Sequence, residues 1–173
     1  YKGNIQVESK PGKGTAFQLY FPIVSEKPVM EKESDDFELK TGTEKILFID
    51  DEKSILKLGS RVLGNLGYDV VIAENGAAAL EYFKREPEKF DLIITDMTMP
   101  VMLGTDVAQR MTKIKSDIPI IICTGFSDRI NKEDAAACGV KAIINKPILN
   151  SDLANQVRTV LDQTGKDQPC IES

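Results

Sequence analysis

From Glu44 onward the sequence alternates between short apolar runs and longer amphipathic segments, and this alternation most constrains the fold. The runs KILFID, DLIITD and IPIIICT hold consecutive hydrophobic residues, which is typical of strands covered on both faces. Strand, crossover helix and strand in succession predict a parallel sheet with helices on both sides. We predict five strands, at 45–50, 68–73, 91–96, 118–124 and 141–145, and five helices, at 53–67, 75–86, 104–115, 129–139 and 150–164.

The first 43 residues follow a different pattern. Residues 4–9 and 16–23 alternate in hydrophobicity around a glycine-rich turn, which predicts a β-hairpin. A lone hairpin is marginally stable in water, so we expect it to belong to a larger sheet or to dock on a partner. Residues 25–43 are polar and acidic, as in a linker. The predicted organisation is therefore a short strand pair at 1–24, an acidic linker at 25–43, one α/β domain at 44–163 and a flexible tail at 164–173.

Composition excludes several function classes. The net charge of −5 argues against a nucleic-acid-binding surface, and no apolar run reaches the roughly 20 residues of a membrane span. The chain has no histidine, which removes Ser-His-Asp and Cys-His catalysis, histidine-containing zinc sites and any phosphohistidine. Three cysteines, Cys123, Cys138 and Cys170, fit a reducing compartment and packing roles. The first residue is not Met and no signal-peptide pattern follows it, so we expect a cytoplasmic piece of a longer protein.

Polar side chains follow the apolar runs at the predicted carboxyl ends of the strands. Asp96 ends the third strand, although Asp is depleted in strands and costly to bury without a partner. Asp96 is therefore either a simple turn residue at the strand end or a carboxylate that the strand positions for a chemical function. In parallel sheets, ligands bind outside the carboxyl ends of the strands. Four strand ends would bring polar residues together there: Asp50, Asp51 and Glu52, then Asp96, then Thr124, then Asn145 and Lys146.

Such a cluster favours phosphoryl chemistry. Three carboxylates repel one another unless a cation lies among them, and Mg²⁺ prefers oxygen ligands. Lys146 would neutralise a further charge, and a carboxylate can act as the nucleophile that becomes phosphorylated. Each residue taken alone has a simpler explanation, such as a turn or a helix start complemented by acids. Their joint occurrence favours Asp96 as a phosphoryl acceptor.

Four segments, FIDDE, IITDMTMP, ICTGFSD and AIINKP, resemble the receiver domain of two-component response regulators over about residues 44–163. The resemblance implies a flavodoxin-like, doubly wound sheet and makes Asp96 the phosphoacceptor. It implies that Mg²⁺ is bound directly by Asp51 and Asp96, through water by Asp50, and by the backbone carbonyl of Thr98. Thr124 and Lys146 would contact the phosphoryl group.

The resemblance also implies a cis peptide before Pro147 and an aromatic residue where this chain has Ile143. The isoleucine would leave the phosphorylation chemistry intact, but it lacks the aromatic ring whose movement signals phosphorylation in this family. Residues 1–23 are similar to the last strands of a histidine-kinase ATP-binding domain, including GKGT. The order of segments resembles a hybrid sensor histidine kinase, although the ATP site itself is absent from this stretch. Such a receiver would catalyse only its own phosphorylation and dephosphorylation.

Three function hypotheses follow. The first is a relay that takes a phosphoryl group from the phosphohistidine of a histidine kinase or histidine phosphotransfer protein. The second is a docking module that binds such a protein without chemistry. The third, an aspartyl-phosphate phosphohydrolase, usually needs a second acid two positions after the nucleophile, where this chain has Thr98. We expect a monomer or weak dimer that binds no nucleic acid and no membrane, with partners docking near Ile143, Asn145 and the helix after Thr124.

Overall fold

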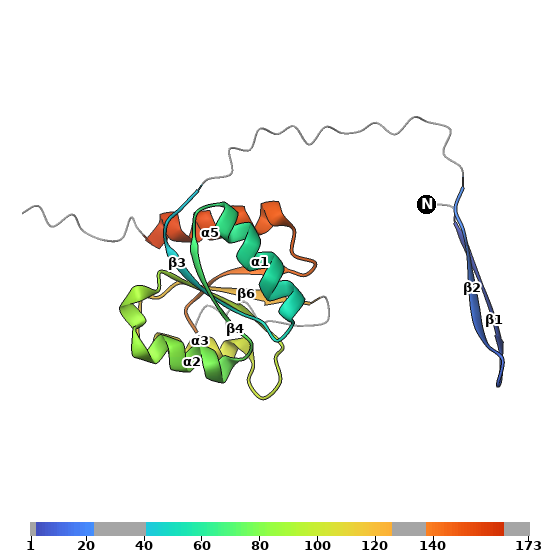
Figure 1. The fold of residues 1–173 in the computed structure, drawn as a ribbon, viewed down its shortest axis with the longest axis horizontal. Helices are drawn as coiled ribbons and strands as arrows, with labels where there is room; N and C mark the ends of the chain where they lie inside the picture. Colours follow the sequence, from blue (N-terminus) through green and yellow to red (C-terminus); the bar gives the residue numbers. More distant parts are fainter. Residues whose placement is uncertain (1–2, 23–40, 126–137, 165–173) are drawn as a thin grey trace, which may run out of the picture. The chain divides into compact units, whose positions relative to one another are not determined.

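The computed structural model describes residues 3–22, 41–125 and 138–164, and it divides the chain into two compact units, 1–37 and 38–173. In the first unit, strands β1 (Asn4–Lys10) and β2 (Gly14–Tyr20) form the predicted antiparallel hairpin (Figure 1). Gly12 in its turn and Gly14 at the start of β2 have φ values of 73° and 94°, a region that glycine adopts without steric cost. Val7 faces Phe17 across the ladder and Ile5 faces Leu19, so one hairpin face is apolar.

The second unit contains a five-stranded parallel sheet in the order β4-β3-β5-β6-β7. The strands span Lys45–Ile49 (β3), Asp69–Ala73 (β4), Leu92–Asp96 (β5), Ile120–Thr124 (β6) and Val140–Asn145 (β7). The chain order reverses between β3 and β5, because β4 lies on one side of β3 while β5, β6 and β7 follow on the other. This is the flavodoxin-like order, and its switch point opens at the carboxyl ends of β3 and β5.

Helices cover both faces of this sheet. They are α1 (Lys53–Asn65), α2 (Gly76–Arg85), α3 (Gly104–Thr112) and α5 (Asn150–Thr164), with a short 3-10 helix at Pro87–Lys89. The predicted helix at 129–139 falls mainly on residues outside the described ranges, and Cys138 and Gly139 within it form a turn. Four of the five predicted helices are therefore found in the described part of the chain.

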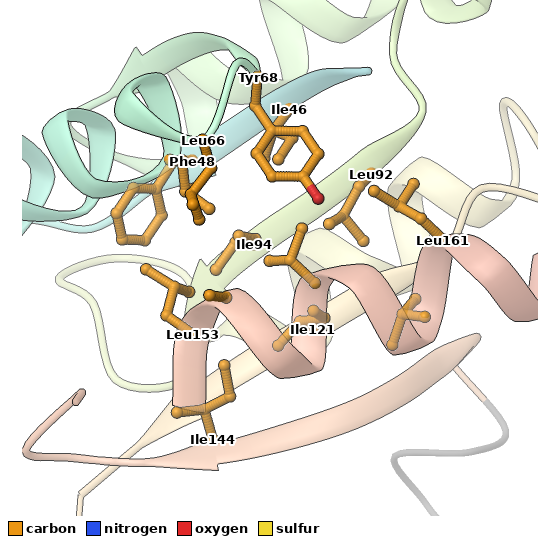
Figure 2. Close-up of a cluster of buried hydrophobic side chains, with 14 of the residues drawn as sticks. Ile46, Phe48, Leu66, Tyr68, Leu92, Ile94, Ile121, Ile144, Leu153 and Leu161 are labelled. Atoms are coloured by element: carbon orange, nitrogen blue, oxygen red, sulfur yellow. The ribbon is translucent and has the colours of Figure 1, made fainter. Parts of the chain in front are cut away.

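Two buried clusters explain why the strand sequences are apolar on consecutive positions. Ile46 and Phe48 of β3 face a cluster closed by α1 and α5, which Figure 2 shows from within. Leu47 and Ile49 face a second cluster, closed by α2 and α3. Every residue of β5 and β6 is buried, as predicted for strands covered on both sides.

Candidate functional site

The switch point of the sheet holds two buried carboxylates. Asp50 directly follows β3 and is fully buried, and Asp96 is the last residue of β5 and is 5% exposed. The two strands are neighbours in register, with Ile49 opposite Thr95, so the next residues of both strands meet at this edge. The backbone N–H of Glu52 donates to Asp50 Oδ1 at 2.8 Å, which holds that carboxylate at the start of α1.

Lys146 joins the two carboxylates. Its Nζ lies 2.9 Å from Asp50 Oδ2 and 2.7 Å from Asp96 Oδ1. The lysine follows β7, and its backbone N–H donates to the carbonyl of Thr124 at 2.7 Å. The Lys146–Pro147 peptide is cis, as the resemblance implied. Three residues separated by 46 to 96 positions in the sequence therefore form one ion-paired cluster at the carboxyl edge of the sheet.

Burial sets the electrostatics of this cluster. Desolvation raises the pKa of Asp96 above its usual value, and the hydrogen bond from Lys146 only partly offsets that rise. Burial lowers the pKa of Lys146, but hydrogen bonds to Asp96 and Asp50 outweigh this effect, so its pKa is raised overall. Lys146 is thus held in its charged form, which is the form that can bind an anionic group.

The loop after β5 fixes the Asp96 carboxylate from the other side. The backbone N–H of Thr98 donates to Asp96 Oδ2 at 3.2 Å. The loop closes on itself where the N–H of Gly104 donates to the carbonyl of Met97 at 2.9 Å. A Cβ at Gly104 would lie 2.3 Å from the carbonyl oxygen of Asp96, so only glycine lets the loop return this closely.

The remaining predicted site residues lie at the same edge. Thr124 ends β6, is 4% exposed, and pairs with Asn145 across the β6–β7 ladder. Asp51 follows Asp50 with an exposed side chain. The side-chain contacts described above join Asp50, Asp96 and Lys146, and the backbone of Thr98 holds Asp96. Thr124 is joined to Lys146 through its backbone carbonyl, while Asp51 is placed here by following Asp50. Among the described residues, no three acidic or cysteine side chains already form a ready metal-binding group.

Sequence reasoning brought Asp50 and Lys146 to the same edge of the sheet, but it did not predict the direct ion pair between them. No spacing in the sequence signals it, because the contact depends on the order of strands in the sheet. Cys123, which pairs with Asp96 on the neighbouring strand, was predicted to be a packing residue, and it is fully buried. Burial raises the pKa of its thiol to about 12, so Cys123 stays protonated and is a poor nucleophile at neutral pH.

The fold and the cluster together define a class of protein: single-sheet α/β domains with a buried acid–lysine site at the switch point. Residues 46–158 match the family described as the response regulator receiver domain. The chain belongs to this family, whose members act in two-component signalling.

Individual relatives agree with this assignment. The chain is 39% identical over 123 residues to ycf27 of Porphyridium aerugineum, described as a probable transcriptional regulator, covering 71% of this chain and 50% of that protein. It is 29% identical over 170 residues to the sensor kinase CckA of Brucella abortus, covering 93% of this chain and 18% of the kinase. A receiver-domain crystal structure from Clostridium thermocellum superposes with a TM-score of 0.68 at 30% identity, covering 72% of this chain and 99% of that one.

The chain spans half or less of the length of these two sequence relatives. None of the helices in the described ranges has the length and apolarity that a membrane crossing requires.

Proposed function

We propose that this receiver accepts a phosphoryl group on Asp96 from a phosphohistidine. The observation that carries the proposal is the buried Asp96 carboxylate, with one oxygen 2.7 Å from the Lys146 ammonium and the other bonded to the Thr98 N–H. A carboxylate fixed in this way at a switch point is preorganised for attack on a bound group. The shared ammonium supplies positive charge where the oxygens of a transferring phosphoryl group would carry negative charge.

An oxygen of ionised Asp96 attacks phosphorus, the phosphorus–nitrogen bond of the phosphohistidine breaks, and its electron pair returns to the departing imidazole. Lys146 would then bind an oxygen of the transferred group, and the hydroxyl of Thr124, at the end of the neighbouring strand, would bind another. No proton need be removed from the nucleophile, which fits a chain without histidine.

The oxygen-rich donor set suits Mg²⁺. The carboxylates of Asp50, Asp51 and Asp96 and the backbone carbonyl of Thr98 are the residues that would hold it, because a hard cation prefers such ligands and keeps several waters. When bound, the metal supplies positive charge that neutralises phosphoryl oxygens. Asp51 is exposed and therefore accessible to a hydrated ion, while Asp50 and Asp96 already engage the lysine.

We further propose that the chain is part of a hybrid sensor histidine kinase. The match to CckA extends over nearly the whole chain rather than the receiver alone, which favours this context. In it, the hairpin β1–β2 would be the last strand pair of a kinase ATP-binding domain, residues 25–43 a linker and residues 44–163 the receiver. The expected partners are a histidine kinase or a histidine phosphotransfer protein.

A docking module without phosphorylation is the second candidate. Ile143 is half-buried on β7 at the usual aromatic position, so this position has no aromatic side chain that could transmit a change at the site to the surface. The expected signature of this alternative is partner binding that Asp96→Ala leaves unchanged in a protein that never becomes phosphorylated.

The deciding experiment is intact-protein mass spectrometry after incubation with Mg²⁺ and a small phosphodonor such as phosphoramidate. We expect a gain of one phosphoryl group in the wild type and none in Asp96→Asn. Asp117→Asn, at an exposed acid between α3 and β6, is the matched control and should behave as the wild type. No mass gain in the wild type would overturn the proposal.

A further inference from the structure

The loop between β5 and α3 contains a backbone outlier beside the site. Val101 has a φ of 73° and is the one non-glycine residue with positive φ in the described ranges. For a β-branched residue this left-handed region is a true outlier, because Cβ and the branch crowd the backbone. Asparagine or glycine would hold the same turn at lower cost.

The Val101 side chain makes no compensating contact within the domain. It is 105% exposed, as open to solvent as in an extended chain. Its neighbours behave differently: Met99 is 5% exposed and Met102 packs against the cluster under α2 and α3, so both anchor the loop. The loop is thus fixed at its anchors and at its closure on Gly104, while its tip presents one strained, apolar side chain.

The position of Val101 near Asp96 indicates which partner would contact it. Asp96 lies at the base of the same loop, and its side chain is 7% exposed. A phosphohistidine must bring its phosphorus to about 3–3.5 Å from the carboxylate before transfer. Since the chain contains no histidine, the phosphohistidine lies outside this sequence, and the protein that carries it must approach Asp96 beside the loop that holds Val101. Leu103, 44% exposed, is a second exposed apolar side chain in this loop, directly before α3.

We propose that Val101 is an apolar contact for the phosphohistidine-bearing protein surface that delivers the phosphoryl group to Asp96. The inference rests on the proposed function and names the part of the β5–α3 loop that the donor protein contacts. Burying an exposed branched side chain at a protein interface stabilises the complex, and a rigid loop presents it without a further ordering cost. A small phosphodonor has no such surface and makes no use of Val101.

The test compares two donors on the same variants of the full chain. The small donor is phosphoramidate with Mg²⁺. The protein donor is CckA of Brucella abortus, shortened to exclude only the part that aligns with residues 44–163 of this chain and labelled with radioactive ATP. The variants are Val101→Asn, which relieves the strain and removes the apolar group, and Val101→Thr, which keeps the branched shape and changes only its polarity. Val101→Ile keeps the apolar contact, and Tyr82→Asn, at a 43% exposed position on α2, is the surface control.

We expect Val101→Asn to raise the melting temperature by about 2–5 °C through strain relief. Phosphorylation of Val101→Asn and Val101→Thr by phosphoramidate should stay within about twofold of the wild type, while transfer from the kinase falls at least about fivefold. Val101→Ile and Tyr82→Asn should accept from both donors as the wild type does.

Equal transfer from the kinase to the wild type, Val101→Asn and Val101→Thr would overturn the inference. So would labelling of the wild type by phosphoramidate but not by the kinase. Failure of both donors on the wild type would instead remove the proposed function, so the two failures are distinguishable.

Discussion

The receiver carries two clusters of the same charge composition at opposite edges of its sheet, and they differ mainly in burial. At the carboxyl edge, Lys146 lies between Asp50 and Asp96. At the amino edge, Arg158 of α5 lies 2.8 Å from Glu44 and 2.9 Å from Asp162. Each has two carboxylates around one cation.

The exposures of the acids separate the two clusters. The Asp50 and Asp96 side chains are 0% and 7% exposed, whereas those of Glu44 and Asp162 are 27% and 42% exposed. Solvated charges are screened and contribute little, whereas buried charges depend on their partners. Burial, rather than the kinds of residue, therefore makes one cluster a candidate reactive site and leaves the other as a structural link between α5 and the residue before β3.

The largest expected effect separates the two cations. Lys146→Met leaves two buried carboxylates without their cation and should lower the free energy of unfolding by about 3 kcal/mol. Arg158→Met removes a better-solvated pairing and should cost about 1 kcal/mol or less. Urea unfolding at pH 7 measures both. Equal losses would show that burial does not distinguish the clusters.

The next effect concerns the glycine beside each cluster. Gly104→Ala places a Cβ 2.3 Å from a backbone oxygen of Asp96, which cannot move without moving β5, so we expect a loss of about 2 kcal/mol. Gly42→Ala meets side-chain atoms rather than backbone, a Glu44 carboxylate oxygen and the Tyr68 ring, so it should cost less than Gly104→Ala. Thermal unfolding of the two variants tests this order, and a greater loss in Gly42→Ala would contradict it.

A smaller effect of opposite sign is expected for Asp96→Asn. Because burial raises the pKa of Asp96, its ionised form is less favourable in the folded protein than in the unfolded chain. The neutral isostere should therefore be more stable than the wild type by about 1 kcal/mol at pH 7. The difference should shrink as the pH falls through the raised pKa toward 3.8, the ordinary value, because wild-type Asp96 is then protonated too.

Urea titrations of Asp96→Asn at several pH values would follow this difference. Asp162→Asn, at the more exposed cluster, serves as the control and should show little change at any of them. A wild type that is more stable than Asp96→Asn at pH 7 would contradict the burial argument.

The smallest effect lies at the amino edge. Tyr68 is 4% exposed, and its hydroxyl interacts with Arg158 without forming a hydrogen bond of good geometry. Tyr68→Phe should therefore gain about 0.5 kcal/mol at pH 7. Burial also raises the pKa of Tyr68 above 10, so its contribution to stability is present below pH 10 and is lost as the pH rises through the folded-state pKa. Tyr68→Phe should lack this alkaline loss in unfolding curves recorded from pH 9 upward, and identical alkaline curves would contradict the assignment.

Most of the sheet was predictable because its signal is local. Consecutive apolar residues predicted all five strands of the receiver to within about two residues, and helical spacing predicted α1, α2, α3 and α5. Asn75 caps the start of α2, where its side chain accepts a hydrogen bond from the N–H of Ala78. The 3-10 helix at Pro87–Lys89 was missed, since three residues carry no periodicity.

The site was only partly predictable because its contacts are not local. The strand ends predicted that Asp96 and Lys146 would meet, and they do. The bond between Lys146 and Asp50 required the strand order, and the strain at Val101 required the path of the loop. The Arg158 link to Glu44 was missed as well, because both residues look like ordinary surface charges in the sequence.

The lysine that bridges Asp50 and Asp96 affects how ions bind at this site. Its ammonium already neutralises part of the negative charge, so a dication alone would be repelled by the ammonium, and an anion alone would be repelled by the two carboxylates. A dication and an anion that bind together leave the net charge of the site almost unchanged, and each strengthens the binding of the other. We therefore expect cation and anion binding at this edge to be cooperative, with the Lys146 ammonium moving from a carboxylate to the bound anion.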